Sequence, residues 1–199
     1  AMTGRMDLRT FYVLYGSGSN SKSVITTILK MILNDFYCQC SKSIVVKSKN
    51  NDAKSASPEL IQIMNKRLIV FSEGETSDNC ELNTSLIKNI TGQDEINARP
   101  LYKNNISFLP TCKILILSNY IPSSTAETAI IDRIRFINMQ VRFSDNPKKG
   151  ELKRDPEYIE KIIKPNINQF FTYLLEGSNL FYKNKIIQVP KTFQKFTEE

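Results

Sequence analysis

The stretch that decides the expected fold is Gly16-Ser17-Gly18-Ser19-Asn20-Ser21-Lys22-Ser23. It follows Phe11–Tyr15, a short apolar and aromatic run that is typical of a buried strand. After it, apolar residues recur at helical spacing and predict a helix from about Lys22 to Asn34. A loop of glycine and serine between a buried strand and a helix is the setting in which proteins bind phosphate groups.

The loop matches most of the phosphate-binding pattern GxxxxGK[ST]. Gly16, Lys22 and Ser23 fit the pattern, and Ser21 stands where the second glycine is expected. All eight loop residues are therefore candidates for binding a nucleotide through backbone N–H groups at a helix N-terminus. Lys22 would reach the β and γ phosphates, and the Ser23 hydroxyl would ligate Mg²⁺. The alternative is a Ser/Gly loop that only links strand to helix.

Polar residues follow two further buried runs. Glu73 comes shortly after Leu68–Phe71, with Glu75 two residues later, and Asn119 follows Ile114–Leu117. At the carboxyl edge of a parallel sheet, Glu73 would hold the Mg²⁺ shell and Glu75 would orient the attacking water. Asn119 would place an amide beside the γ-phosphate. Taken singly, the acids could be exposed loop charges, and Asn119 could be a turn residue.

Two other groups of residues are candidates for binding anions. Arg133 and Arg135 lie in an otherwise apolar segment, as surface charges or as a finger aimed at a neighbouring subunit's nucleotide. The irregular alternation from Ile96 to Leu109 predicts a β-hairpin with Lys103-Asn104-Asn105 at its turn. Near the tip of this hairpin, Arg99, Tyr102 and Lys103 combine cations with an aromatic ring, which suits a phosphate backbone and a stacked base. A solvated hairpin is the alternative.

Buried strand runs that alternate with helices predict an α/β fold with a largely parallel sheet. We expect two further strands: a short one over Ser43–Lys47, within the basic loop Lys42–Ser57, and a half-exposed one over Ile137–Phe143. We also expect three further helices: one that starts at Ser57-Pro58, one over Leu82–Ile90, and one that contains Ile167–Leu175 and ends at Gly177. We divide the chain into an N-terminal extension or vector-derived remnant (1–10), a core (11–143) and a C-terminal helical segment (144–199).

Composition narrows the possible functions. The chain has 199 residues, a net charge of +7 and no histidine, which excludes imidazole-based catalysis. The sequence pI of about 9.2 is in the range of nucleic-acid-binding domains. Four cysteines without a CxxC pair indicate reduced thiols and an intracellular protein. We expect no membrane association, because the sequence has neither a long apolar run nor a signal peptide.

The order of these motifs resembles the superfamily 3 helicase domain of the poxvirus-type primase-helicases of large DNA viruses. The resemblance covers roughly Phe11 to Val141. It rests on the phosphate loop and on four later stretches: Lys66–Glu75, Leu86–Arg99, Phe108–Asn119 and Ala129–Arg135. The Leu86–Arg99 stretch, with the Tyr102-Lys103 pair that follows it, is more specific than the loop because generic phosphate-loop proteins do not share it.

The resemblance implies an AAA+-like, three-layer P-loop ATPase with an inserted β-hairpin. Such proteins form hexameric rings that use ATP and Mg²⁺ to translocate on single-stranded or forked DNA, together with other viral replication proteins. It further implies that Glu73 is the Walker B acid, Asn119 the sensor 1 residue and Arg133 the arginine finger acting in trans. The hairpin around Lys103 would grip DNA. A poxvirus-like origin would place the protein in the host cytoplasm.

Two departures from the family pattern leave alternatives open. Ser21 replaces the usual glycine, and Ile131-Asp132 stand where the family often has a Trp-Arg pair. The main hypothesis is an ATP-dependent DNA helicase motor. The alternatives are a catalytically weak nucleic-acid-binding or assembly module with a degenerate phosphate loop, and an AAA+ ATPase that remodels protein.

Overall fold

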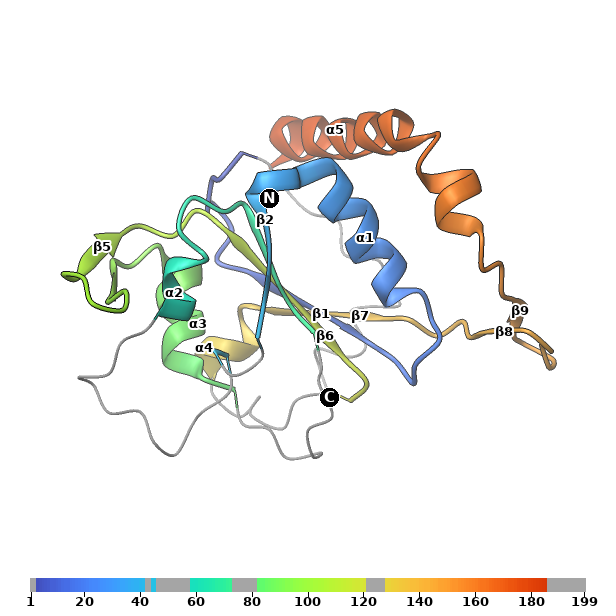
Figure 1. The fold of residues 1–199 in the computed structure, drawn as a ribbon, viewed down its shortest axis with the longest axis horizontal. Helices are drawn as coiled ribbons and strands as arrows, with labels where there is room; N and C mark the ends of the chain where they lie inside the picture. Colours follow the sequence, from blue (N-terminus) through green and yellow to red (C-terminus); the bar gives the residue numbers. More distant parts are fainter. Residues whose placement is uncertain (1–2, 42–43, 46–57, 73–81, 121–127, 186–199) are drawn as a thin grey trace.

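The core of the molecule is a parallel sheet of five strands with helices on both faces (Figure 1). The computed structural model describes residues 3–41, 44–45, 58–72, 82–120 and 128–185. The sheet order is β2-β3-β6-β1-β7, and its strands are β1 (Phe11–Tyr15), β2 (Tyr37–Cys40), β3 (Leu68–Phe71), β6 (Lys113–Ser118) and β7 (Ile134–Asn138). All four strand pairings are parallel, which confirms the predicted α/β fold class.

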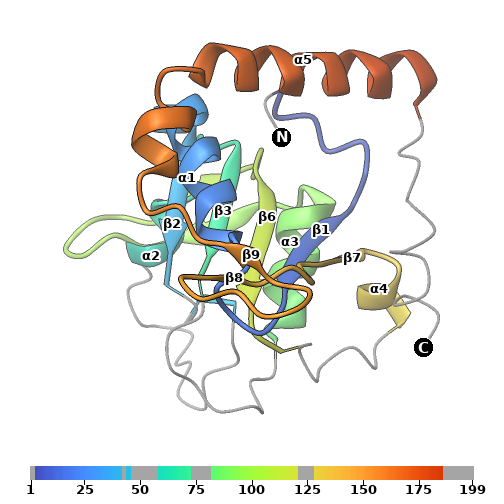
Figure 2. The ribbon, with the colours of Figure 1, turned by 90° about the vertical axis from the view of Figure 1, so that its right-hand side faces the viewer.

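Alternating side chains on the strands build two separate apolar layers. Phe11 and Val13 of β1 face one layer, which also contains Ile87 and Ile90 of α3 (Thr84–Gly92). Leu14 faces the other layer. That second layer contains partly buried residues of α1 (Lys22–Leu33) and lies below α5 (Ile167–Asn184), as Figure 2 shows. The remaining described helices are α2 (Pro58–Ile61), α4 (Thr128–Ile131) and the short turns η1 (Asn34–Phe36) and η3 (Ile159–Ile163).

Two small pairs of strands lie outside the central sheet. The antiparallel hairpin of β4 (Ile96–Ala98) and β5 (Ile106–Phe108) is inserted between α3 and β6, which confirms the predicted hairpin. The pair β8 (Phe143–Ser144) and β9 (Leu152–Lys153) is parallel and follows β7. Figure 1 shows these two pairs at opposite ends of the molecule.

The strand predicted at Ser43–Lys47 is wrong for its described residues, Ile44 and Val45, which are in a turn. The strand is instead β2, which pairs with β3 through Tyr37↔Leu68 and Cys40↔Phe71. The run Tyr-Cys-Gln-Cys is only four residues long and contains one strand-enriched residue, Tyr37, so its local pattern is a weak signal and its place is decided by pairing with β3. Ile44 and Val45 are buried in the core without belonging to a strand.

Two other boundaries differ from prediction. The strand predicted over Ile137–Phe143 begins earlier and ends earlier, because β7 pairs along the whole of β1 from Phe11↔Ile134 to Tyr15↔Asn138. The last helix does not end at Gly177 but continues to Asn184. A glycine within a helix costs about 1 kcal/mol, and beyond Gly177 the helix is joined to the N-terminal segment by a hydrogen bond between the hydroxyls of Tyr182 and Thr3.

Candidate phosphate-binding site

The glycine–serine loop connects the carboxyl end of β1 to the N-terminus of α1, as predicted. Four of its residues have positive φ angles: Gly16 (151°), Gly18 (86°), Ser19 (51°) and Ser21 (66°). The Gly18 N–H donates to the Gly16 carbonyl at 2.8 Å, and the Ile25 N–H donates to the Ser21 carbonyl at 3.2 Å, which starts the helix. The chain therefore curls tightly in front of a helix N-terminus, where backbone N–H groups favour an anion.

Lys22 and Asn119 meet at this loop although 97 positions separate them. The register Tyr15↔Ser118 between β1 and β6 places the residues that follow these two strands side by side. The Lys22 ammonium donates to the Gly16 carbonyl at 2.5 Å and to the Asn119 Oδ1 at 3.1 Å. Only 9% of Lys22 is exposed, so its charge is held inside the loop by oxygen acceptors.

The segment after β7 supports the outer side of the loop, which the sequence reasoning missed. The Asn20 side chain, 4% exposed, donates to the Met139 carbonyl at 3.0 Å. The Phe143 N–H donates to the Ser19 carbonyl at 2.7 Å. A side chain at Gly16 would come within 2.6 Å of the Met139 carbonyl oxygen and would overlap the Asn20 amide. In the sequence, Asn20 is one polar residue in a loop rich in serine, so nothing there marks it as a residue that supports the loop from a buried position.

The predicted acids Glu73 and Glu75 lie outside the described residues. The strand that precedes them, β3, is parallel to β6 with Phe71 opposite Ile116, so it ends at the same carboxyl edge as the loop. Ser23 lies in the first turn of α1, and its side chain is exposed. The assignments of Ser23 and Glu73 to Mg²⁺ both stay predictions.

Arg133 lies at the amino-terminal end of the sheet's strands, whereas Lys22 lies at their carboxyl-terminal end. The Arg133 carbonyl accepts the Phe11 N–H at 2.9 Å at the start of β1, whereas Lys22 lies beyond the end of that strand. Its guanidinium donates through Nη1 to the Ala129 carbonyl at 2.5 Å. Its buried Nε has no hydrogen-bond partner within the described part of the chain. Arg135 donates locally, to the carbonyls of Asp132 and Ile134.

The predicted DNA-binding residues lie on the hairpin and not near the phosphate loop. Arg99, Tyr102 and Lys103 are all exposed, and Tyr102 is fully so. The hairpin precedes β6, so it lies toward the amino edge of the sheet and projects from the end of the molecule away from the loop (Figure 1).

The cysteines of the described residues are free, and two of them, Cys40 and Cys112, are buried. Burial raises the pKa of Cys112 to about 12, and burial also raises the pKa of Cys40. Across the described ranges, no group of three His, Cys, Asp or Glu side chains is placed to hold a metal. In the same part of the chain, the helices are too short or too polar to cross a bilayer.

The fold and the loop together define a class: an α/β domain with a five-stranded parallel sheet and a strand–glycine loop–helix unit at its carboxyl edge. The chain belongs to the family of unknown function DUF5906, which matches residues 14–133. The match covers the last two residues of β1, the loop, the hairpin and the segment up to Arg133.

Similar proteins come from large DNA viruses. The chain is 36% identical over its whole length to a protein of Acanthamoeba polyphaga mimivirus provisionally named helicase L207/L206, of which it covers 21%. Over 89% of its length it is 28% identical to a protein of African swine fever virus provisionally named primase C962R, of which it covers 19%. The chain thus spans about a fifth of the length of these relatives.

Solved structures show the same fold at low sequence identity. The apo structure of the NrS-1 C-terminal region (A form) aligns with a TM-score of 0.59 at 16% identity, covering 83% of this chain and 36% of that one. A further apo structure of the same region gives a TM-score of 0.56 at 15% identity. These alignments agree with the α/β fold.

We predict that Ser21→Gly stabilises the protein. Ser21 has a left-handed backbone, and its side chain makes no capping hydrogen bond to α1. Glycine would relieve strain of about 1–2 kcal/mol but would lose more chain entropy on folding, for a net gain of about 0.5–1 kcal/mol. Urea unfolding followed by circular dichroism measures this change.

Ser17→Gly is the matched control in the same loop. Ser17 is not among the described residues with positive φ, so glycine there should lower stability by about 0.4–1 kcal/mol through chain entropy alone. Equal effects of the two substitutions would show that the conformation of Ser21 is not strained.

Proposed function

We propose that this chain is the ATP-dependent motor domain of a viral primase-helicase of superfamily 3, which hydrolyses ATP at subunit interfaces to translocate on DNA during genome replication in the host cell. The observation that carries the proposal is the pair of hydrogen bonds from Lys22 to Gly16 and Asn119. These bonds bring a buried cation, a glycine loop and an amide together at the N-terminus of α1. The names of the relatives support a role in replication.

The arrangement suits recognition of a triphosphate. Backbone N–H groups of residues 16–23 would bind phosphate oxygens, and the Lys22 ammonium would exchange the Gly16 carbonyl for a phosphate oxygen. Asn119 would stay close to Lys22 and orient the terminal phosphate or the attacking water. Ser23 and Glu73 would hold Mg²⁺, which supplies positive charge for the developing charge on the phosphate oxygens.

The position of Arg133 supports hydrolysis between subunits. The length of β1 separates Arg133 from the loop of its own chain, so its guanidinium can serve a nucleotide only in a neighbouring copy. A head-to-tail contact of this kind closes into a ring when its rotation allows. A homo-oligomer, hexameric in the full-length protein, is the assembly that fits.

The exposed hairpin supports DNA as the polymer on which the protein translocates. Arg99 and Lys103 are exposed, so the hairpin presents positive charge to solvent, and the fully exposed Tyr102 ring could stack on a base. A catalytically weak binding module is a second candidate, because Ser21 places a side chain at a left-handed position of the loop. That module would bind DNA without hydrolysing ATP.

We expect Lys22→Ala to abolish nucleotide-dependent activity. The substitution removes the cation that the loop holds, and losing one preorganised charge donor of this kind lowers kcat about 100-fold or more. The measurement is ATPase rate with and without single-stranded DNA at several protein concentrations. Lys30→Ala is the control, because Lys30 is an exposed lysine in the last turn of the same helix.

A rate stimulated by DNA, rising with protein concentration and lost only in Lys22→Ala, is the expected result. Salt-sensitive DNA binding without any hydrolysis would contradict the motor and favour the binding module. Hydrolysis that DNA does not stimulate would favour an ATPase that remodels protein.

Mixing two inactive variants tests whether Arg133 acts in trans. Lys22→Ala and Arg133→Ala should each lack activity alone. In an equal mixture about one quarter of head-to-tail interfaces would pair an intact Lys22 with an intact Arg133 of the neighbour, so activity should partly return. Full activity of Arg133→Ala alone, or no recovery on mixing properly folded variants, would contradict a finger in trans.

Lys103→Ala should weaken single-stranded DNA binding for all sequences alike. Loss of one phosphate contact lowers the slope of log affinity against log salt by about 0.7 to 1. The measurement is fluorescence anisotropy of a labelled oligonucleotide across a salt series. Lys183→Ala, which changes an exposed lysine on α5, should leave the slope unchanged; an unchanged slope in Lys103→Ala as well would remove the hairpin from the DNA interface.

A further inference from the structure

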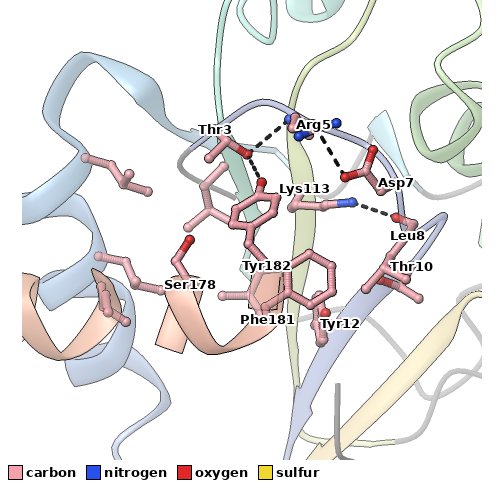
Figure 3. Close-up of a pocket in the computed structure, with 15 residues that line it drawn as sticks. Thr3, Arg5, Asp7, Leu8, Thr10, Tyr12, Lys113, Ser178, Phe181 and Tyr182 are labelled. Atoms are coloured by element: carbon pink, nitrogen blue, oxygen red, sulfur yellow. Dashed lines mark hydrogen bonds and ion pairs between the residues drawn. The ribbon is translucent and has the colours of Figure 1, made fainter. Parts of the chain in front are cut away.

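A cavity of about 340 Å³ lies between the sheet and α5 (Figure 3), and no residue of the phosphate loop lines it. Its floor is the amino half of the three central strands and its roof is α5, while α1 and the N-terminal segment form the sides. The apolar lining is contributed by Leu8, Tyr12, Leu29, Leu33, Leu68, Leu115, Leu174 and Phe181. Cavities of this size are large enough for a small organic ligand.

The cavity exists because α5 does not pack tightly on the sheet. None of the 18 residues of α5 is buried, although Leu174 and Phe181 face inward. A hydrogen bond of 2.7 Å between the hydroxyls of Tyr182 and Thr3 joins α5 to the N-terminal segment. The roof is therefore held at its end by a polar contact, and the space below it is not filled by side chains.

Two polar groups at the amino end of the floor need an acceptor. Lys113, the first residue of β6, has its ammonium bonded to the Leu8 carbonyl at 2.6 Å, and an ammonium has three donors. Thr10 is 8% exposed and also lines the cavity. Its hydroxyl has no hydrogen-bond partner within the described residues. Desolvation lowers the pKa of Lys113, so an anion beside it would relieve an unfavourable burial of charge.

The charge of the lining selects the class of ligand. Arg5 and Asp7 also line the cavity and pair with each other at 3.4 Å. Desolvation lowers the pKa of Lys113 more than the Asp7 carboxylate raises it, and with two cations and one acid the lining carries one net positive charge. A nucleotide, with several negative charges, does not match a single net positive charge among apolar walls. A molecule with an apolar body and one carboxylate matches both the apolar walls and the single net positive charge.

We propose that the cavity under α5 binds a small amphipathic carboxylate, with its apolar body against the leucines and its carboxylate beside Lys113 and Thr10. Leu29 and Leu33 of the lining belong to α1, the helix whose N-terminus holds the phosphate loop. A ligand here therefore contacts the far end of the loop's helix. The proposal does not rest on the function proposed above, and its test needs no nucleotide.

The test is isothermal titration calorimetry of the 199-residue chain with octanoate, and with octanamide as the neutral match. We expect one octanoate per chain. Lys113→Met should weaken octanoate about tenfold, as expected for loss of a charged hydrogen bond, and should leave octanamide unchanged. Ser178→Trp should abolish binding of both by filling the space under the roof, because Ser178 lines the cavity.

Asn179→Trp is the control for Ser178→Trp. Asn179 is the next residue of α5, is exposed and does not line the cavity, so this variant should bind like the wild type. If circular dichroism shows that Ser178→Trp is misfolded, Lys113→Met decides, since it leaves α5 untouched. No saturable binding, equal binding to Ser178→Trp and Asn179→Trp, or octanoate affinity unchanged in Lys113→Met would overturn the proposal.

Discussion

The parallel register between β1 and β6 is the constraint on which the rest of the site depends. Pairing Tyr15 with Ser118 brings the first residue of the glycine loop next to Asn119, and the Gly16 N–H donates to the Ser118 carbonyl at 3.2 Å. The Lys22 ammonium then has two oxygen acceptors within reach. A shift of one residue in this register would send alternate side chains to the wrong face and would separate Lys22 from Asn119.

The loop keeps its shape through contacts on both sides. β6 supports it through the Ser118 carbonyl, and the segment after β7 supports it through Asn20 and the Ser19 carbonyl. These bonds hold four residues at positive φ, two of them serines for which that conformation is costly. Tertiary contacts therefore stabilise a local conformation that the loop sequence itself disfavours at Ser19 and Ser21.

The two ends of the parallel sheet separate the candidate functions of the chain. The carboxyl edge holds Lys22 and Asn119, and the amino edge holds Arg133. The hairpin with Tyr102 and Lys103 lies toward the amino edge as well. Because one chain cannot bring Arg133 to its own loop, a complete site of the proposed kind needs two copies.

The sequence by itself determined the buried strands β1, β3 and β6, the helix after the loop and the hairpin, because each is marked by a dense apolar run or a clear turn. It also predicted that the glycine loop, Lys22 and Asn119 lie at one edge, since residues that follow buried parallel strands share that edge, and the hydrogen bonds from Lys22 to Gly16 and Asn119 show them together there. Only the tertiary structure decided the place of β2, the extent of β7 and α5, the support of the loop by Met139 and Phe143, and the cavity under α5. These features depend on pairing and packing between segments distant along the chain, such as β2 with β3 or α5 with the sheet, and local residue patterns do not encode such contacts.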